Sequence, residues 1–200
     1  YVVSTLIFSS FTTDNSGPAG CQEGNCLNGY GKYQYANGNR YVGDFYDGKP
    51  HGNGILYCSN GNKYLGQWEN NWRQGKGKFI FQEGHEYQGG FRRNNFHGTG
   101  TMNYANGDIY QGQWLSNLPN GSGTYTFIKG GKYEGGFKDG RFHGTGVMFY
   151  KDGSRHYGKW KNNKKNGKGQ EYNKAGELVK DGVWENDVFV KPAKAKKKKS

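Results

Sequence analysis

The sequence predicts an all-β protein, a single-layer elongated ribbon of antiparallel β-hairpins that repeats with a 23-residue period. Three observations carry this prediction. A Tyr-x-Gly-x-Phe/Trp motif recurs at a constant interval, glycine supplies 36 of the 200 residues, and apolar side chains alternate with period two between turn residues. No segment favours a helix, and the two-residue alternation is typical of strands.

Composition limits the alternatives. Only 32% of the residues are hydrophobic and the mean hydropathy is -1.05, which argues against a thick two-layer core. Aromatic residues nevertheless reach 16%, whereas disordered chains are poor in aromatics. Four prolines are too few for collagen. The chain is therefore expected to fold around a thin aromatic core.

The repeats share their first residue and their glycines. The motif begins at Tyr41, Tyr64, Tyr87, Tyr110, Tyr133 and, with histidine in the tyrosine slot, His156. A later copy, shifted by one residue, keeps Gly182 and Trp184, and Asn28 to Gly38 resembles the second half of a repeat. A period of this size is typical of a repeat array in which each element mainly contacts its neighbours.

Each repeat is expected to hold two strands, with a tight turn before the first strand of the next repeat. Asn37-Gly38, Asn60-Gly61, Asn106-Gly107 and Asp152-Gly153 lie between the apolar runs, and such pairs supply the positive φ angles of hairpin turns. Alternation places the aromatic residues at repeat positions 1 and 5 on the same face as the bulky residues at positions 16 and 18. The interleaved glycines leave room for large rings over the backbone.

This pattern predicts five segments. They are an apolar N-terminal segment (1–17), a cap with a half repeat (18–40), six full repeats (41–178), a half-repeat cap (179–190) and a basic flexible tail (191–200).

The repeated residues resemble MORN (membrane occupation and recognition nexus) repeats. Repeats 41–63 and 133–155 carry the complete pattern, including His51 and His143, while Asn71, Asn94, Asn117 and Asn163 replace a mid-repeat glycine. The resemblance implies a curved β-ribbon used as an interaction surface, in proteins that occur at membranes, cytoskeletal assemblies and cilia. It carries no catalytic motif, so we predict no enzyme activity, no catalytic residue and no cofactor.

Neither a nucleotide nor a metal site is expected. Gly75-Lys76, Gly131-Lys132 and Gly167-Lys168 are not followed by the serine or threonine that a phosphate-binding loop requires. His51, His97 and His143 occupy the same slot in alternate repeats, which places them about 19 Å apart and too far from one another to share an ion. The three cysteines, Cys21, Cys26 and Cys58, leave three alternatives open. These are a disulfide between Cys21 and Cys26, inert thiols, or a metal-binding or reactive site, although three cysteines fall short of a tetrahedral zinc set.

The two termini suggest contacts of their own. Residues 1–11 are apolar and too short to span a bilayer, and are read either as the remnant of an export signal or as an added strand. The first alternative places the protein outside the cytoplasm or in a periplasm, and the second leaves it cytoplasmic, with membrane or cytoskeletal association open. A candidate surface for anionic lipid is formed by the tail lysines Lys191, Lys194, Lys196, Lys197, Lys198 and Lys199.

We predict a noncatalytic scaffold that binds another protein, with a peripheral membrane protein as the alternative. An oligomer is left open, and nucleic acid is disfavoured because the charge outside the tail is thinly spread. Since a one-layer sheet has nothing to cover its aromatic face, rings in the middle repeats are expected to stay partly exposed and to contact the partner. These candidates are Trp72, Phe79, Phe81, Phe91, Phe96, Tyr104, Trp114 and Tyr125.

Overall fold

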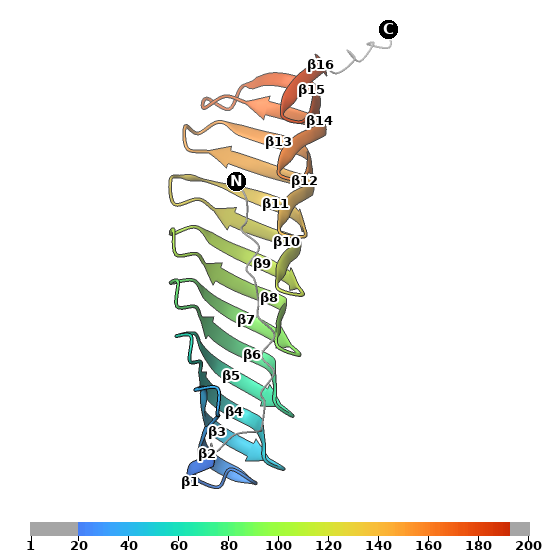
Figure 1. Cartoon of the computed structure of the whole chain (residues 1–200). Helices are drawn as coiled ribbons and strands as arrows, with labels where there is room; N and C mark the ends of the chain where they lie inside the picture. The colour runs from blue at the N-terminus through green and yellow to red at the C-terminus, as the bar shows by residue number, and fades with distance from the viewer. Residues whose placement is uncertain (1–19, 193–200) are drawn as a thin grey trace. The chain divides into compact units, whose positions relative to one another are not determined.

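The computed structural model describes residues 20–192, which form β-strands and turns and include no helix (Figure 1). The described residues accordingly offer no helix that is long and apolar enough to cross a membrane. The strands are β1 (Gly20–Gly24), β2 (Gly29–Gln34), β3 (Arg40–Tyr46), β4 (Lys49–Tyr57), β5 (Lys63–Glu69), β6 (Trp72–Ile80), β7 (Glu86–Arg92), β8 (Asn95–Asn103), β9 (Ile109–Leu115), β10 (Leu118–Thr126), β11 (Gly131–Lys138), β12 (Arg141–Tyr150), β13 (Arg155–Lys161), β14 (Lys164–Tyr172), β15 (Leu178–Glu185) and β16 (Val188–Pro192). The predicted all-β class with two strands in each repeat is confirmed.

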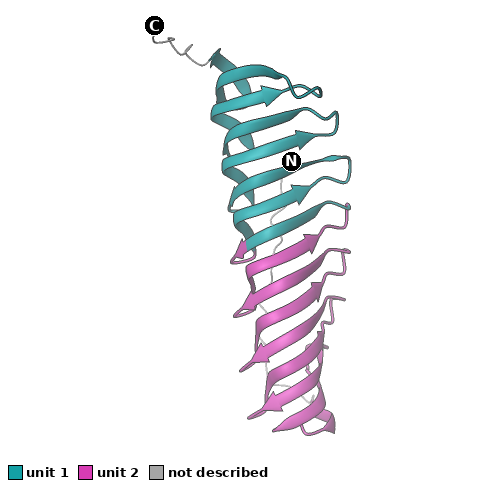
Figure 2. Ribbon diagram, turned by 180° about the vertical axis from the view of Figure 1, so that it is seen from behind, with its two compact units in different colours: residues 1–4, 107–113, 118–200 teal, residues 5–106, 114–117 magenta. Residues whose placement is uncertain are grey.

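The strands divide between two compact units (Figure 2). Unit 2 contains residues 20–106 and Trp114–Asn117, and unit 1 contains Gly107–Gln113 and residues 118–192. Within unit 2, β1 to β8 pair antiparallel in chain order. Within unit 1, β10 to β16 do the same. Each unit is therefore a single sheet of consecutive hairpins.

The turns between repeats lie where the Asn-Gly pairs predict them, but their geometry differs from the expectation. The N–H of Gly38 donates to the carbonyl of Tyr35 at 3.0 Å, and the N–H of Tyr35 donates to the carbonyl of Asn39 at 2.8 Å. Gly38 has a φ of 83°, whereas Asn37 is not among the residues with positive φ. These connections are three-residue loops that need only one left-handed residue, which glycine supplies.

The two-residue hairpin turns lie instead in the middle of each repeat. Asp47 and Gly48 have φ angles of 48° and 68°, and Asn162 and Asn163 have 51° and 68°. Two successive positive φ angles define the type I′ turn, whose twist matches that of paired strands. Asparagine tolerates this conformation better than other side chains, which explains why it replaces the mid-repeat glycine four times.

A bend in five of the hairpins creates the core. The register between β3 and β4 shifts between Gly43 and Phe45, and Gly52 opposite this bulge has a φ of 63°. The hairpin tip therefore turns toward the inner face of its own sheet, and the same device recurs in β5–β6, β7–β8, β11–β12 and β13–β14. The bent tip takes the place of a second layer.

Rings fill this bend and lie over glycines, as predicted. Tyr41 and Phe45 pack edge to face with ring centroids 5.0 Å apart, and Tyr41 also contacts Trp68 of the next repeat at 5.2 Å. A Cβ on Gly54 would lie 2.1 Å from the Tyr41 hydroxyl oxygen, so only glycine fits there. The Tyr41 hydroxyl donates to the carbonyl of Asp44 at 3.0 Å, satisfying the polar end of a ring that is fully buried.

Candidate functional site

The structure buries most of the rings expected on the docking surface. Phe79, Phe81, Phe91, Phe96 and Trp114 are all buried, at most 8% exposed, so the expectation that they remain partly exposed is wrong. The bent hairpin tips cover the inner face, where Phe96 stacks on Tyr87 with ring centroids 3.7 Å apart, so a single layer does not leave this face open. Tyr104 and Tyr125 are half-buried, whereas Trp72 is 48% exposed.

Trp114 illustrates the structural role of this group. Its indole N–H donates to the carbonyl of Gly100 at 3.1 Å, and its ring meets Tyr87 and Phe96 at 5.1 and 5.6 Å. Each of these contacts lies inside unit 2. Trp114 therefore packs against glycine and neighbouring rings and has no surface to offer a partner in this conformation.

The outer face of unit 2 carries an apolar row that the sequence prediction missed. Val42, Ile55 and Leu65 are direct cross-strand neighbours on β3, β4 and β5, and each is half-buried. Lys32 and Lys78 are the next residues of the row at its two ends. Tyr30, which is 66% exposed, lines the same shallow hollow as these three aliphatic residues.

The row continues into a polar region toward the hairpin tips. His51, Gln67, Glu69 and Gln74 line a second hollow beside the first. Here the carboxamide oxygen of Gln67 accepts from the Lys76 N–H at 2.7 Å. The Lys76 N–H thus gains a hydrogen-bond acceptor across the bulge, while the outer surface of the hollow stays open.

A third hollow lies at the tips of β5–β6 and contains the exposed Trp72. Glu69, Gln74 and Arg93 line it together with Trp72. Gln74 also accepts the backbone N–H of Arg93 through its side-chain oxygen at 3.0 Å, which ties neighbouring hairpin tips together.

These three hollows share residues, so they form one continuous surface, which we call the outer track. Asn53 lines both the first and the second hollow, and Glu69 and Gln74 line both the second and the third. The outer track thus extends from Tyr30 over the apolar row to Trp72 and Arg93. It combines an apolar end, a polar middle and an aromatic end with adjacent charges.

Several titratable side chains of the described residues are buried. Residues 20–192 contain no group of three or more histidine, cysteine or acidic side chains that could hold a metal ion. Burial raises the pKa of the Cys58 thiol to about 11, which keeps it protonated and unreactive at neutral pH. Burial likewise raises the pKa of the Tyr87 hydroxyl.

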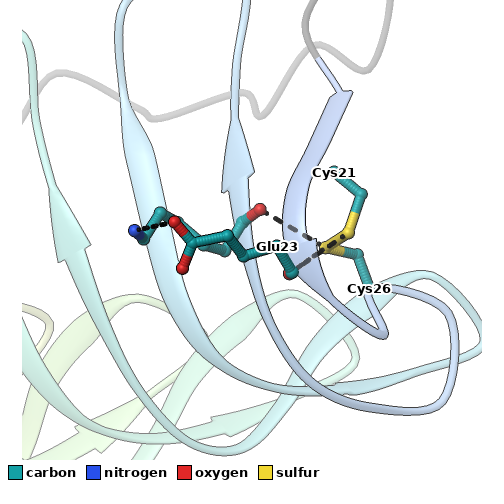
Figure 3. Close-up of polar contacts among 4 residues, drawn as sticks. Cys21, Glu23 and Cys26 are labelled. Atoms are coloured by element: carbon teal, nitrogen blue, oxygen red, sulfur yellow. Dashed lines mark hydrogen bonds and ion pairs between the residues drawn. A yellow bond between two sulfur atoms is a disulfide. The ribbon is translucent and has the colours of Figure 1, made fainter.

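The remaining sequence predictions concern the two ends of the described chain. Cys21 and Cys26 form a disulfide with a Cα–Cα distance of 5.7 Å, one of the alternatives that the sequence leaves open (Figure 3). Glu23 between them pairs with the Lys32 ammonium at 2.8 Å. Lys191 lies exposed in β16, whereas residues 1–17 and the other tail lysines lie outside the described residues.

The alternation of inward and outward positions along the repeat is the sequence signal that could have predicted the outer track. Repeat positions 2 and 15 alternate with positions 1, 3, 14 and 16, which face the aromatic core, and therefore point outward. In the first two repeats these positions hold Val42, Ile55, Leu65 and Lys78, against Gln88, Thr101, Gln111 and Thr124 in the next two. Three aliphatic residues at outward positions that are polar in the next two repeats mark a surface patch.

The fold defines a β-hairpin repeat protein with an open outer face, and the comparisons identify its family. A family model for the MORN repeat matches residues 27–40, 41–63, 64–86, 87–109, 110–132, 133–155 and 156–176. The match covers most of the chain, which therefore belongs to the MORN-repeat family. No curated protein matches the sequence.

The chain is similar in fold to a solved structure. The TCP domain of SAS-4 (dCPAP) from Drosophila melanogaster, solved in complex with a proline-rich motif of Ana2 (dSTIL), has a TM-score of 0.51 and 14% identity, with 86% of this chain and 95% of that chain covered. The wild-type TCP10 domain of Danio rerio CPAP is 15% identical over 78% of this chain and 90% of that chain, with a TM-score of 0.24.

Proposed function

We propose that this protein is a noncatalytic interaction scaffold and that the outer track of unit 2 binds an extended segment of a partner protein. The observation that carries the proposal is the continuity of the three hollows between two exposed aromatic side chains, Tyr30 and Trp72. Exposed tyrosine and tryptophan are the residues most often found as anchors in protein interfaces.

The dimensions of the outer track favour an extended peptide. It crosses the strands from β2 to the tip of β7, five inter-strand steps of about 4.8 Å, or about 24 Å in total. A fully extended chain covers this distance with about seven residues at about 3.4 Å each. Shallow, open hollows suit side chains of such a segment better than an enclosed small molecule, which favours a deep pocket.

The chemistry of the track suggests which segment fits. Apolar side chains of the partner would contact Val42, Ile55 and Leu65, and a proline or another apolar residue would stack on Trp72. The SAS-4 TCP domain, which is similar in fold, was solved with a proline-rich motif. Proline-rich segments adopt an extended conformation with a low entropic cost of binding, and exposed aromatic rings recognise them.

A peptide selection tests the proposal. The whole chain is used to select binders from a displayed library of random 12-residue peptides, and the selected peptides are measured against Tyr30→Ala, Trp72→Ala and a control, Ile128→Ala. Ile128 is 63% exposed and lies in unit 1. We expect each track variant to lose about tenfold or more in affinity and the control to retain it. Selected peptides that bind all three variants equally would refute the assignment of the outer track.

A further inference from the structure

A second surface stands out at two neighbouring hairpin tips of unit 1. Lys138 pairs directly with Arg141 across the β11–β12 tip, and Lys161 pairs directly with Lys164 across the β13–β14 tip. All four side chains are exposed. They flank the buried Phe137, Phe142 and Trp160, so alternation directs them to the outer face.

The pairing places like charges opposite one another. Direct cross-strand neighbours have Cβ atoms about 4.5–5.5 Å apart, and like charges at that distance destabilise a hairpin. None of the ion pairs formed within residues 20–192 includes any of these four cations. Asp139, in the turn of the first tip, is the nearest acidic residue in sequence.

Other tips show that the fold does not require this arrangement. The equivalent pairs in unit 2 are Tyr46 with Lys49, Glu69 with Trp72 and Arg92 with Asn95. Each combines a charged residue with a neutral one. At two successive tips of unit 1, two cations face each other, and their repulsion lowers the stability of the hairpins. An anionic ligand would offset this repulsion.

We propose that these two tips, which we call the basic tips, bind an acidic segment of a partner protein. The basic surface is bounded, because the next tip in the sheet carries Glu185 and Asp187. A membrane presents negative charge to every tip that faces it and would repel this neighbour. A short peptide can contact the two basic tips alone.

The spacing defines the acidic segment further. Neighbouring tips are two strands apart, about 9.6 Å. In an extended peptide, residues three apart are separated by about 10 Å. The basic tips therefore match two acidic pairs separated by one residue, as in Glu-Glu-Ser-Glu-Glu, with one pair at each tip.

Fluorescence anisotropy with the whole chain tests this inference. The probe is a labelled peptide, Ser-Glu-Glu-Ser-Glu-Glu-Ser, and its glutamine counterpart serves as the uncharged control. The test variant carries K138Q, K161Q and K164Q. The matched variant carries K129Q, K151Q and K174Q, which removes the same charge from exposed turns of unit 1.

We expect the test variant to bind the acidic probe about tenfold more weakly, since an exposed ion pair contributes about two- to fivefold in affinity. The matched variant should retain binding within about twofold. The melting temperature of the test variant should be equal to or above that of the unchanged chain, because the substitutions relieve repulsion, and this separates lost binding from unfolding.

Three outcomes would overturn the inference. The first is equal loss of binding in the test and matched variants. The second is loss of binding on glutamine substitution of the tail lysines alone, which would assign the acidic probe to the tail. The third is binding of phosphatidylserine vesicles that depends on the basic tips, together with no binding of the peptide, which would identify a lipid surface instead.

Discussion

The clearest test of how the repeats couple is the pair of substitutions Asn163→Gly and Asn71→Gly. Both asparagines hold the second position of a type I′ turn, with φ angles of 68° and 71°. The Asn163 side-chain oxygen accepts the backbone N–H of Phe142, one repeat earlier, at 2.7 Å. Asn71 faces Pro50 in the preceding repeat, just as Asn163 faces Phe142. Proline has no backbone N–H, so Pro50 cannot donate the equivalent hydrogen bond.

The two variants should therefore behave differently. Asn163→Gly deprives the N–H of Phe142, a residue only 8% exposed, of its acceptor, which costs about 1–3 kcal/mol. Glycine adopts the left-handed conformation more readily than asparagine and offsets part of this cost. The net loss of about 1–2 kcal/mol corresponds to a melting temperature lower by about 3–6 °C. Asn71→Gly removes no acceptor from a backbone N–H of the preceding repeat, because Pro50 has none, and should therefore lower the melting temperature less than Asn163→Gly does.

Thermal unfolding followed by circular dichroism measures both variants under one set of conditions. Asn163→Asp is the control, because the carboxylate keeps an oxygen that can accept the N–H of Phe142. Asp187 accepts the Lys165 N–H in the same way, at 2.7 Å. Equal shifts in the two glycine variants would refute the proposed inter-repeat bond as the reason for asparagine at Asn163.

Four further predictions address the core, its pH response, the repeat and the tail. Gly100→Ala should lower the free energy of unfolding by about 1–3 kcal/mol, since the new Cβ would lie 2.5 Å from the Tyr87 hydroxyl oxygen; Gly20→Ala, with no atom within 4 Å, is its control in the same melting experiment. Burial lowers the pKa of His156 from 6.5 to about 4, so the unfolded chain binds the proton more readily and stability should fall as the pH decreases from about 6.5 to about 4. His156→Tyr should remove this component in melts across that range, and an unchanged slope would contradict it. Deletion of residues 64–86 restores the repeat phase and should leave cooperative melting, whereas deletion of 12 residues at the same place should abolish it; equal loss would count against nearest-neighbour coupling. Removing residues 191–200 should abolish binding to anionic vesicles, and high salt should abolish the binding of the whole chain. Salt-resistant binding by the shortened chain would assign lipid contact to the repeats.

Local chemistry determined much of this fold. The recurrence of Tyr-x-Gly-x-Phe/Trp predicts strand position, period and which side chains share a face, because alternation along a strand is independent of distant contacts. The Asn-Gly pairs correctly predict where repeats join. The packing of the Tyr41 ring over Gly54 could likewise be predicted from the sequence, because a ring that recurs beside a glycine needs the space that only glycine leaves.

Tertiary structure decided the rest, and the bend at the bulge is the physical reason. Gly52 opposite the Gly43–Phe45 bulge turns the hairpin tip inward, and this long-range geometry buries rings that the sequence pattern alone leaves on an open face. Trp114 is buried while Trp72, in the same chain, is exposed, because they lie on opposite faces near the tips. Cross-strand register likewise brings Val42 beside Ile55 and Lys161 beside Lys164, neighbours that become visible only when the strands are paired.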